Sequence, residues 1–330
     1  MTGGRRGFSM VSSAALFRAG AGKRILATQQ QYDVFISAFN VSERVTSTFE
    51  RIEATRKFWV IHNEYCFENS EMPTDAPVLS SIAGTEADFI LDTLGQITPR
   101  LEPGVRLCID ITGFMRPHLL FLMNFLRISR IGKFDLIYTE PQQYLRKADT
   151  VFSSNVVEVR QINGYEGNHS VDRATDVLVV GVGYDHDLVS HVIANKSSAR
   201  LVQLLSLPSL SADMYQESLI RLHKVADAPI KVPEEQLAYA SANDPFITYL
   251  VLEEAIAKIK ARQQGISNIY LSPLATKPQA VGFAMYYLSH LVGTPASIIF
   301  PFASQYAKET SRGIGRTWLY EMAVELADAV

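Results

Sequence analysis

Short apolar runs alternate with longer segments in which apolar residues recur every three or four positions along most of this chain. The short runs are typical of buried strands and the longer segments of amphipathic helices. Because strands and helices alternate, we predict an α/β fold of mainly parallel sheets covered by helices on both faces. The predicted strands are 32–37, 58–62, 107–111, 134–138, 155–162, 176–180, 200–205, 268–272 and 296–300. The main predicted helices are 39–55, 81–97, 118–130, 188–195, 245–264, 279–291 and 318–329.

One strand–turn–helix–strand unit occurs twice. A cation followed by proline opens each helix: Lys277 follows Arg116 by 161 residues. A tyrosine lies beyond the second strand of each unit, and Tyr306 follows Tyr144 by 162 residues. This agreement in spacing predicts an internal duplication that yields two Rossmann-like lobes.

We place the boundary between the lobes in a segment rich in turn-forming residues around 163–168. Pro141 and Pro301 follow equivalent apolar strands, and we expect each proline to end its strand. The predicted organisation is a leader without regular structure at 1–28, a first lobe at 29–168 and a second lobe at 169–330.

Composition narrows the functional classes. The 330 residues are 47% hydrophobic and 20% charged, with a net charge of −3, so no global positive field recruits DNA. The two cysteines, Cys66 and Cys108, provide no disulfide framework, which favours the reducing cytoplasm. No apolar run is long enough for a membrane helix, so we expect no membrane association.

The repeated turns carry groups that suit phosphate. Thr112 offers a hydroxyl, Gly113 exposed backbone N–H groups, and Arg116 a cation at a helix start. Thr276 and Lys277 repeat the hydroxyl and the cation in the second unit. These five residues are therefore predicted to contact a phosphorylated ligand at the carboxyl ends of the strands.

Other candidates have competing local roles. Tyr144 and Tyr306 could stack on a base, or pack against the preceding helix. Asp110 and Glu140 could serve as a catalytic base or nucleophile. The local alternative is that Asp110 caps its turn, while Arg116 pairs with Asp110 or Glu140.

Common cofactor and metal patterns are incomplete. Gly181-x-Gly183 follows a strand but lacks the third glycine of a dinucleotide fingerprint, so NAD is not predicted. His62, Glu64 and Glu68 lie near one strand end. Their spacing does not provide the third ligand that a typical metal site requires. We therefore predict neither a cofactor nor a metal site.

The strand–Asp-x-Thr-Gly-x-x-Arg–helix unit resembles the ligand loop of the CARF and SAVED families. These families place a turn rich in Thr or Ser and Gly, with a Lys or Arg, between a strand and an apolar helix. The resemblance implies Rossmann-like domains that sense cyclic or linear oligonucleotides in prokaryotic antiviral systems. It also implies a separate effector protein, because no nuclease or protease segment is evident.

Three functional hypotheses follow. The first is a cytoplasmic sensor or regulatory subunit that binds a phosphorylated small molecule, such as a nucleotide or oligonucleotide second messenger, and acts with a separate effector or as a homo-oligomer. The second is a nucleotide- or nucleoside-processing hydrolase or glycosyl transferase that uses Asp110 or Glu140. The third is a structural partner subunit, which would show a large apolar surface patch and no ligand-sized pocket.

Overall fold

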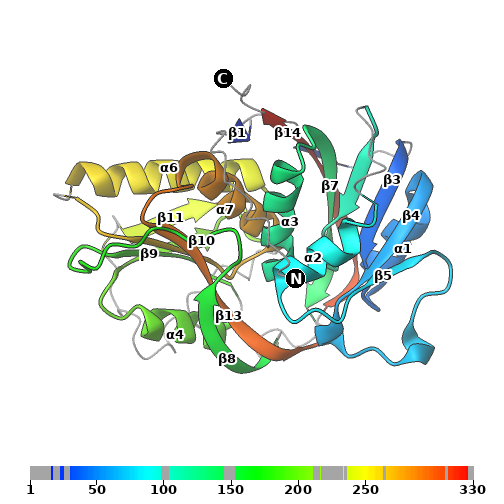
Figure 1. The fold of residues 1–330 in the computed structure, drawn as a ribbon, viewed down its shortest axis with the longest axis horizontal. Helices are drawn as coiled ribbons and strands as arrows, with labels where there is room; N and C mark the ends of the chain where they lie inside the picture. The colour runs from blue at the N-terminus through cyan, green and yellow to red at the C-terminus, as the bar shows by residue number, and fades with distance from the viewer. Residues whose placement is uncertain are drawn as a thin grey trace, which may run out of the picture.

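The computed structural model confirms an α/β fold with two lobes, each built on a mainly parallel sheet flanked by helices (Figure 1). The structure describes residues 16–17, 23–25, 30–97, 104–144, 153–183, 185–210, 216, 233, 236–262, 265–308 and 311–325. No helix within these ranges is both long and apolar enough to cross a membrane.

The first sheet has eight strands in the order β1-β14-β7-β6-β3-β4-β5, with β2 also paired to β14. Its strands are β1 (Leu16–Phe17), β2 (Lys23–Ile25), β3 (Gln31–Ala38), β4 (Glu53–Ile61), β5 (Val78–Ser80), β6 (Leu107–Asp110), β7 (Lys133–Tyr144) and β14 (Ser311–Glu325). The helices of this lobe are α1 (Glu43–Arg51), α2 (Glu86–Leu94) and α3 (Arg116–Ile128), with short 3₁₀ turns η1 (Asn63–Tyr65) and η2 (Asn69–Glu71).

The second sheet has six strands in the order β11-β10-β9-β12-β13-β8. Its strands are β8 (Ser153–Gln161), β9 (Val177–Gly181), β10 (Arg200–Ser206), β11 (Leu237–Ala240), β12 (Ile269–Pro273) and β13 (Ala296–Tyr306). The helices of this lobe are α4 (His186–Asn195), α6 (Pro245–Arg262) and α7 (Lys277–His290).

The two sheets share one topology. The parallel order β7-β6-β3-β4-β5 in the first lobe corresponds to β13-β12-β9-β10-β11 in the second. Each series then ends in an antiparallel strand, β14 beside β7 and β8 beside β13. This equivalence supports the predicted duplication, because the repeated units occupy the same position in both sheets.

The antiparallel strands β8 and β14 are exchanged between the lobes. β8 follows β7 along the chain but pairs with β13 of the second sheet, and β14 follows β13 but pairs with β7 of the first. Sheet membership therefore departs from the predicted division at 168 and 169: residues 153–161 belong to the second sheet and residues 311–325 to the first.

Two predictions about strand ends are wrong for one reason. β7 continues through Pro141 and β13 through Pro301, because both strands extend into long antiparallel pairs. A register irregularity lies within two residues of each proline, where the missing N–H is tolerated.

The predicted helix at 318–329 is also wrong over its described part. There β14 pairs with β7, and this tertiary pairing overrides the local preference for helix.

The predicted leader is partly ordered. β1 and β2 are short strands that pair antiparallel with β14, so residues 16–17 and 23–25 belong to the first sheet. The rest of 1–28 lies outside the described residues.

The hydrophobic core explains why the central helices are apolar on all sides. On β3, Val34 and Ile36 pack on the face that also buries Phe89 of α2, while Phe35 packs with Phe49 of α1 on the opposite face. The apolar cluster that contains Val34, Ile36 and Phe89 continues without interruption into the second lobe. α3 and α7 meet at its centre (Figure 1), so each helix is covered by its own sheet and by the other helix.

Candidate functional site

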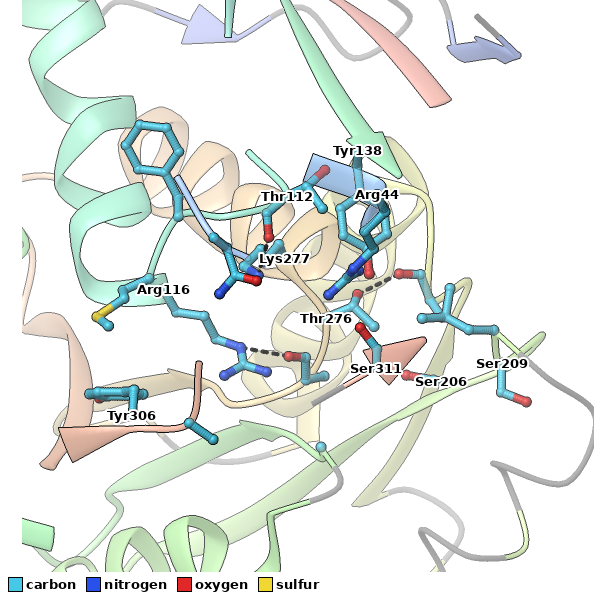
Figure 2. A pocket seen from close by; sticks show the side chains of 18 of the residues that line it. Arg44, Thr112, Arg116, Tyr138, Ser206, Ser209, Thr276, Lys277, Tyr306 and Ser311 are labelled. Atoms are coloured by element: carbon cyan, nitrogen blue, oxygen red, sulfur yellow. Dashed lines mark hydrogen bonds between the residues drawn. The ribbon is translucent and has the colours of Figure 1, made fainter. Parts of the chain in front are cut away.

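A cavity lies between the two lobes at the carboxyl ends of β6 and β12, which is where ligands of parallel sheets bind (Figure 2). Its volume is about 120 Å³. This is below the range of about 300–1,000 Å³ for sites that enclose a whole drug-sized molecule, so the cavity suits a small polar group.

Two helices begin at this cavity, and each begins with a cation. α3 starts at Arg116 and α7 at Lys277, with a proline in the first turn of each. The Thr276 hydroxyl caps α7 by accepting a hydrogen bond from the backbone N–H of Gln279. Because helix starts carry partial positive charge, both ends add to the field of the two side chains.

The two predicted cations cross between the lobes in a reciprocal arrangement. Arg116 of the first lobe donates from Nε to the carbonyl oxygen of Ala275 in the second lobe, at 2.7 Å. Lys277 of the second lobe donates from Nζ to the carbonyl oxygen of Thr112 in the first, at 2.5 Å. Figure 2 shows both side chains extending into the space between the two loops. The duplication therefore brings its two cations to one site.

Arg44 is a third cation at the cavity, and sequence reasoning missed it. It lies in the first turn of α1 and is only 8% exposed. Its Nη1 donates to the carbonyl oxygen of Thr139 at 3.0 Å, whereas its buried Nε has no partner among the described residues. Arg44 also follows the carboxyl end of a strand, β3, but the second lobe has Asp187 at this place in α4, so the repeat gave no signal.

The electrostatic balance of the cavity is positive. Three cations line it, and none of its described lining residues is acidic. Burial, together with the neighbouring Arg44 and Arg116, holds the pKa of Lys277 well below its ordinary value. The nearby carboxyl of Asp110 is buried, which raises its pKa despite hydrogen bonds from Thr112 and Ser37. A bound anion would relieve this repulsion.

Two glycines allow the strand-end loops to approach each other. A Cβ atom at Gly113 would lie 1.8 Å from the carbonyl oxygen of Ala38, and one at Gly183 would lie 2.1 Å from that of Leu274. Because both contacts are with backbone atoms, any larger residue at either position would force the loops apart. Gly183, first noted as part of an incomplete dinucleotide fingerprint, thus has a packing role and also lines the cavity.

The two predicted threonines line the cavity, and both hydroxyls are engaged within the protein. Thr112 Oγ1 accepts a hydrogen bond from the backbone N–H of Thr139 at 2.9 Å, and the Thr112 side chain also hydrogen-bonds the Asp110 carboxyl. Thr276 Oγ1 donates to the carbonyl oxygen of Ala242. Both threonines therefore shape the loops that hold the cations.

The tyrosine predictions have different outcomes. Tyr306 is half-buried and lines the cavity on the side of Arg116 (Figure 2). Burial raises the pKa of Tyr306 to about 12. Tyr144 pairs through its backbone with Ser311, but its side chain lies outside the described part of the structure. Tyr65 and Tyr138 also line the cavity and were not predicted.

The two predicted catalytic carboxylates are buried behind the cavity lining. Asp110 accepts hydrogen bonds from Ser37 Oγ and from the backbone N–H of Thr112, both at 2.9 Å. Glu140 Oε1 accepts from Asn243 Nδ2 at 2.6 Å and from Trp318 Nε1 at 2.7 Å. Both carboxylates thus act locally, holding the loop at Thr112 and joining β7 to β14.

No protein-family model, curated protein or solved structure matches this chain. The geometry of the cavity is therefore the basis on which its function is argued.

Proposed function

We propose that the chain binds a phosphorylated small molecule, such as a nucleotide, in the cavity between its lobes. The observation that carries this proposal is the convergence of Arg44, Arg116 and Lys277 on a cavity whose described lining contains no carboxylate. Three like charges held together in a partly buried space are unfavourable unless an anion neutralises them. Phosphate suits this site, since it accepts several charge-assisted hydrogen bonds and sits well at helix starts.

Aromatic and polar groups make up the remainder of the lining. Tyr306 and Tyr65 provide aromatic surface for a base, while the buried Nε of Arg44, which has no partner among the described residues, provides a polar contact. Cations from both lobes would contact one ligand, so binding would couple the two lobes, as a sensor requires.

The other two hypotheses receive less support. An enzyme that uses Asp110 or Glu140 requires a carboxylate at the ligand, and both of these carboxylates are engaged behind the lining. A purely structural subunit gives no reason for three cations to line one cavity between the lobes. A role in antiviral defence, an oligonucleotide ligand and a separate effector rest on the resemblance to the CARF and SAVED families alone and stay predictions.

Native mass spectrometry of the protein purified from its own host tests the proposal. Spectra recorded before and after mild denaturation should differ by the mass of a released molecule that contains phosphorus. That mass would also identify the ligand class. A chain that releases nothing, and that binds neither pyrophosphate nor any of a panel of nucleotides in titration, would contradict the proposal.

Binding should also weaken at alkaline pH because of Lys277. Its pKa is depressed in the free protein, and a bound phosphate would raise that pKa by stabilising the charged amine. Binding therefore takes up a proton at pH values above the free-state pKa, and affinity falls as the pH rises through that value. We expect this fall to begin well below the ordinary lysine range in titration calorimetry.

The matched variant for this effect is Lys277→Arg, which keeps a positive charge that does not titrate in this range. Its affinity should stay nearly constant over the pH interval in which the wild-type affinity falls. The same alkaline loss in both proteins would mean that another group is responsible.

A further inference from the structure

A second cluster of ligating groups lies beside the cavity in the first lobe. His62 directly follows β4, Glu64 lies in η1, and His118 lies in the first turn of α3. One potential ligand atom from each side chain can be chosen so that all three lie within 4.8 Å of one another. The sequence suggested His62, Glu64 and Glu68, and the structure replaces Glu68 in this set with His118, which is distant in the chain and reaches the other two through the packing of α3.

The hydrogen bonding of both histidines is incomplete. His62 is fully buried and His118 is 5% exposed. The Nδ1 atom of each ring is buried and has no hydrogen-bond partner among the described residues. A neutral imidazole has one donor and one acceptor nitrogen, so two adjacent buried rings that each leave a nitrogen unpaired are unusual without a further binding partner.

The distances in the cluster suit a metal ion. His118 Nε2 lies 3.5 Å from Glu64 Oε1. Two ligands of one tetrahedral zinc, each about 2.0–2.2 Å from the metal, are separated by roughly 3.4 Å. The two imidazole rings are tilted at 60° with their centroids 4.5 Å apart, so the rings are not stacked face to face. With the three ligand atoms within 4.8 Å of one another, the groups lie close to the separations that one ion requires.

The chemistry of the three groups defines the class of ion. Two imidazoles and one carboxylate form a set typical of zinc sites that keep a fourth position for water or substrate. Hard ions such as magnesium and calcium prefer oxygen ligands throughout. Glu64 is the most exposed of the three side chains, at 31%, and gives an ion a route from solvent.

We propose that His62, Glu64 and His118 bind one divalent first-row transition-metal ion, for which zinc is the best match. The ion would fasten the loop after β4 to the first turn of α3, two residues beyond Arg116. The backbone N–H of Met115, the residue before Arg116, already faces His62 Nε2 at 3.4 Å. This metal site does not depend on the phosphate ligand, and each can be tested in the absence of the other.

Zinc titration of the full chain tests the proposal. The protein is freed of metal with a chelator, dialysed, and titrated with zinc in competition with a chromophoric indicator. Wild type should bind one equivalent of zinc. Glu64→Gln and His118→Asn should each lower the affinity for zinc at least about a hundredfold. Residues that only hydrogen-bond to a metal ligand cost about ten- to a hundredfold when they are changed, so loss of a ligand itself should cost at least as much.

The matched control is His191→Asn, because His191 lies exposed on α4, away from the cluster. It should bind zinc as wild type does. Glu64 is partly exposed, so Glu64→Gln decides the result if His118→Asn fails to fold, as judged by circular dichroism. Failure of wild type to bind zinc stoichiometrically, or unchanged affinity in folded Glu64→Gln, would overturn the proposal.

Discussion

Replacing both Arg116 and Lys277 with alanine should lower the affinity for a phosphorylated ligand by about a thousandfold. A hydrogen bond to a charged group contributes about 1.5–3 kcal/mol, and each 1.4 kcal/mol is a factor of ten in affinity. Each single variant should therefore lose roughly ten- to a hundredfold. The fold should persist, because the carbonyl groups of Ala275 and Thr112 that accept these hydrogen bonds lie in loops at the cavity.

Titration calorimetry with pyrophosphate, and with any molecule released from the native protein, measures this loss. Arg316→Ala is the matched control: it removes one positive charge from an exposed position on β14, outside the cavity lining. Its affinity should change less than about threefold at physiological salt, because an exposed charge outside the cavity lining is screened by dissolved ions and makes no hydrogen bond to the ligand. Equal losses in the control and the double variant would indicate a nonspecific field, and unchanged binding in the double variant would exclude this site.

Replacing Glu86 with alanine should destabilise the folded protein by about 3 kcal/mol, which corresponds to a fall in Tm of roughly 4 °C for a chain of 330 residues. The Glu86 side chain is fully buried and forms a bidentate pair with Arg160, at 3.0 and 2.7 Å. It also accepts the backbone N–H of Asn163 at 2.9 Å. Because Glu86 lies on α2 and Arg160 on β8, this pair joins the first lobe to the second sheet.

Glu158→Ala is the matched control, since Glu158 also pairs with Arg160, at 3.2 Å, but its side chain is 57% exposed. Thermal unfolding should show a cost below about 1 kcal/mol for this surface pair. A similar loss of Tm in both variants would show that burial of Glu86 does not strengthen its pairing.

The contribution of Glu86 should depend on pH. Burial raises its pKa, but the hydrogen bonds from Arg160 and Asn163 outweigh burial, and the pKa lies below the ordinary value. The pair therefore stabilises the fold above the unfolded-state pKa, and this stabilisation is lost as the pH falls through the lower folded-state pKa. The difference in Tm between wild type and Glu86→Gln should narrow over that acidic interval.

The sequence was sufficient where local pattern and repetition agreed. Arg116 and Lys277 were found because each precedes a proline at the start of an apolar helix, and a duplication places equivalent residues at equivalent strand ends. The alternation of strands and helices likewise predicted two parallel sheets, since βαβ crossovers permit few other arrangements. Neither unit alone predicts that each cation reaches the loop of the other unit.

The rest depended on contacts between distant segments. Arg44 lies in an ordinary amphipathic helix, and only its burial beside Lys277 distinguishes it from a surface arginine. The stretch from Trp318 onward contains good helix formers, yet the free edge of β7 makes it a strand. His118 is one residue of an apolar helix whose ligating partners lie more than fifty positions earlier. Neither spacing nor propensity reports such pairings.

The exchange of β8 and β14 joins the lobes by two crossing connections, from β7 to β8 and from β13 to β14. Separation of the lobes would have to break the core that continues from one lobe into the other and the pair of Glu86 with Arg160. Shifts of the loops around the cavity break neither and give a ligand a less costly route. The exchange also means that an isolated half would have a strand without its sheet, and two such halves could each accept the strand of the other. The chain thus has the topology that two duplicated halves would form by exchanging one strand each.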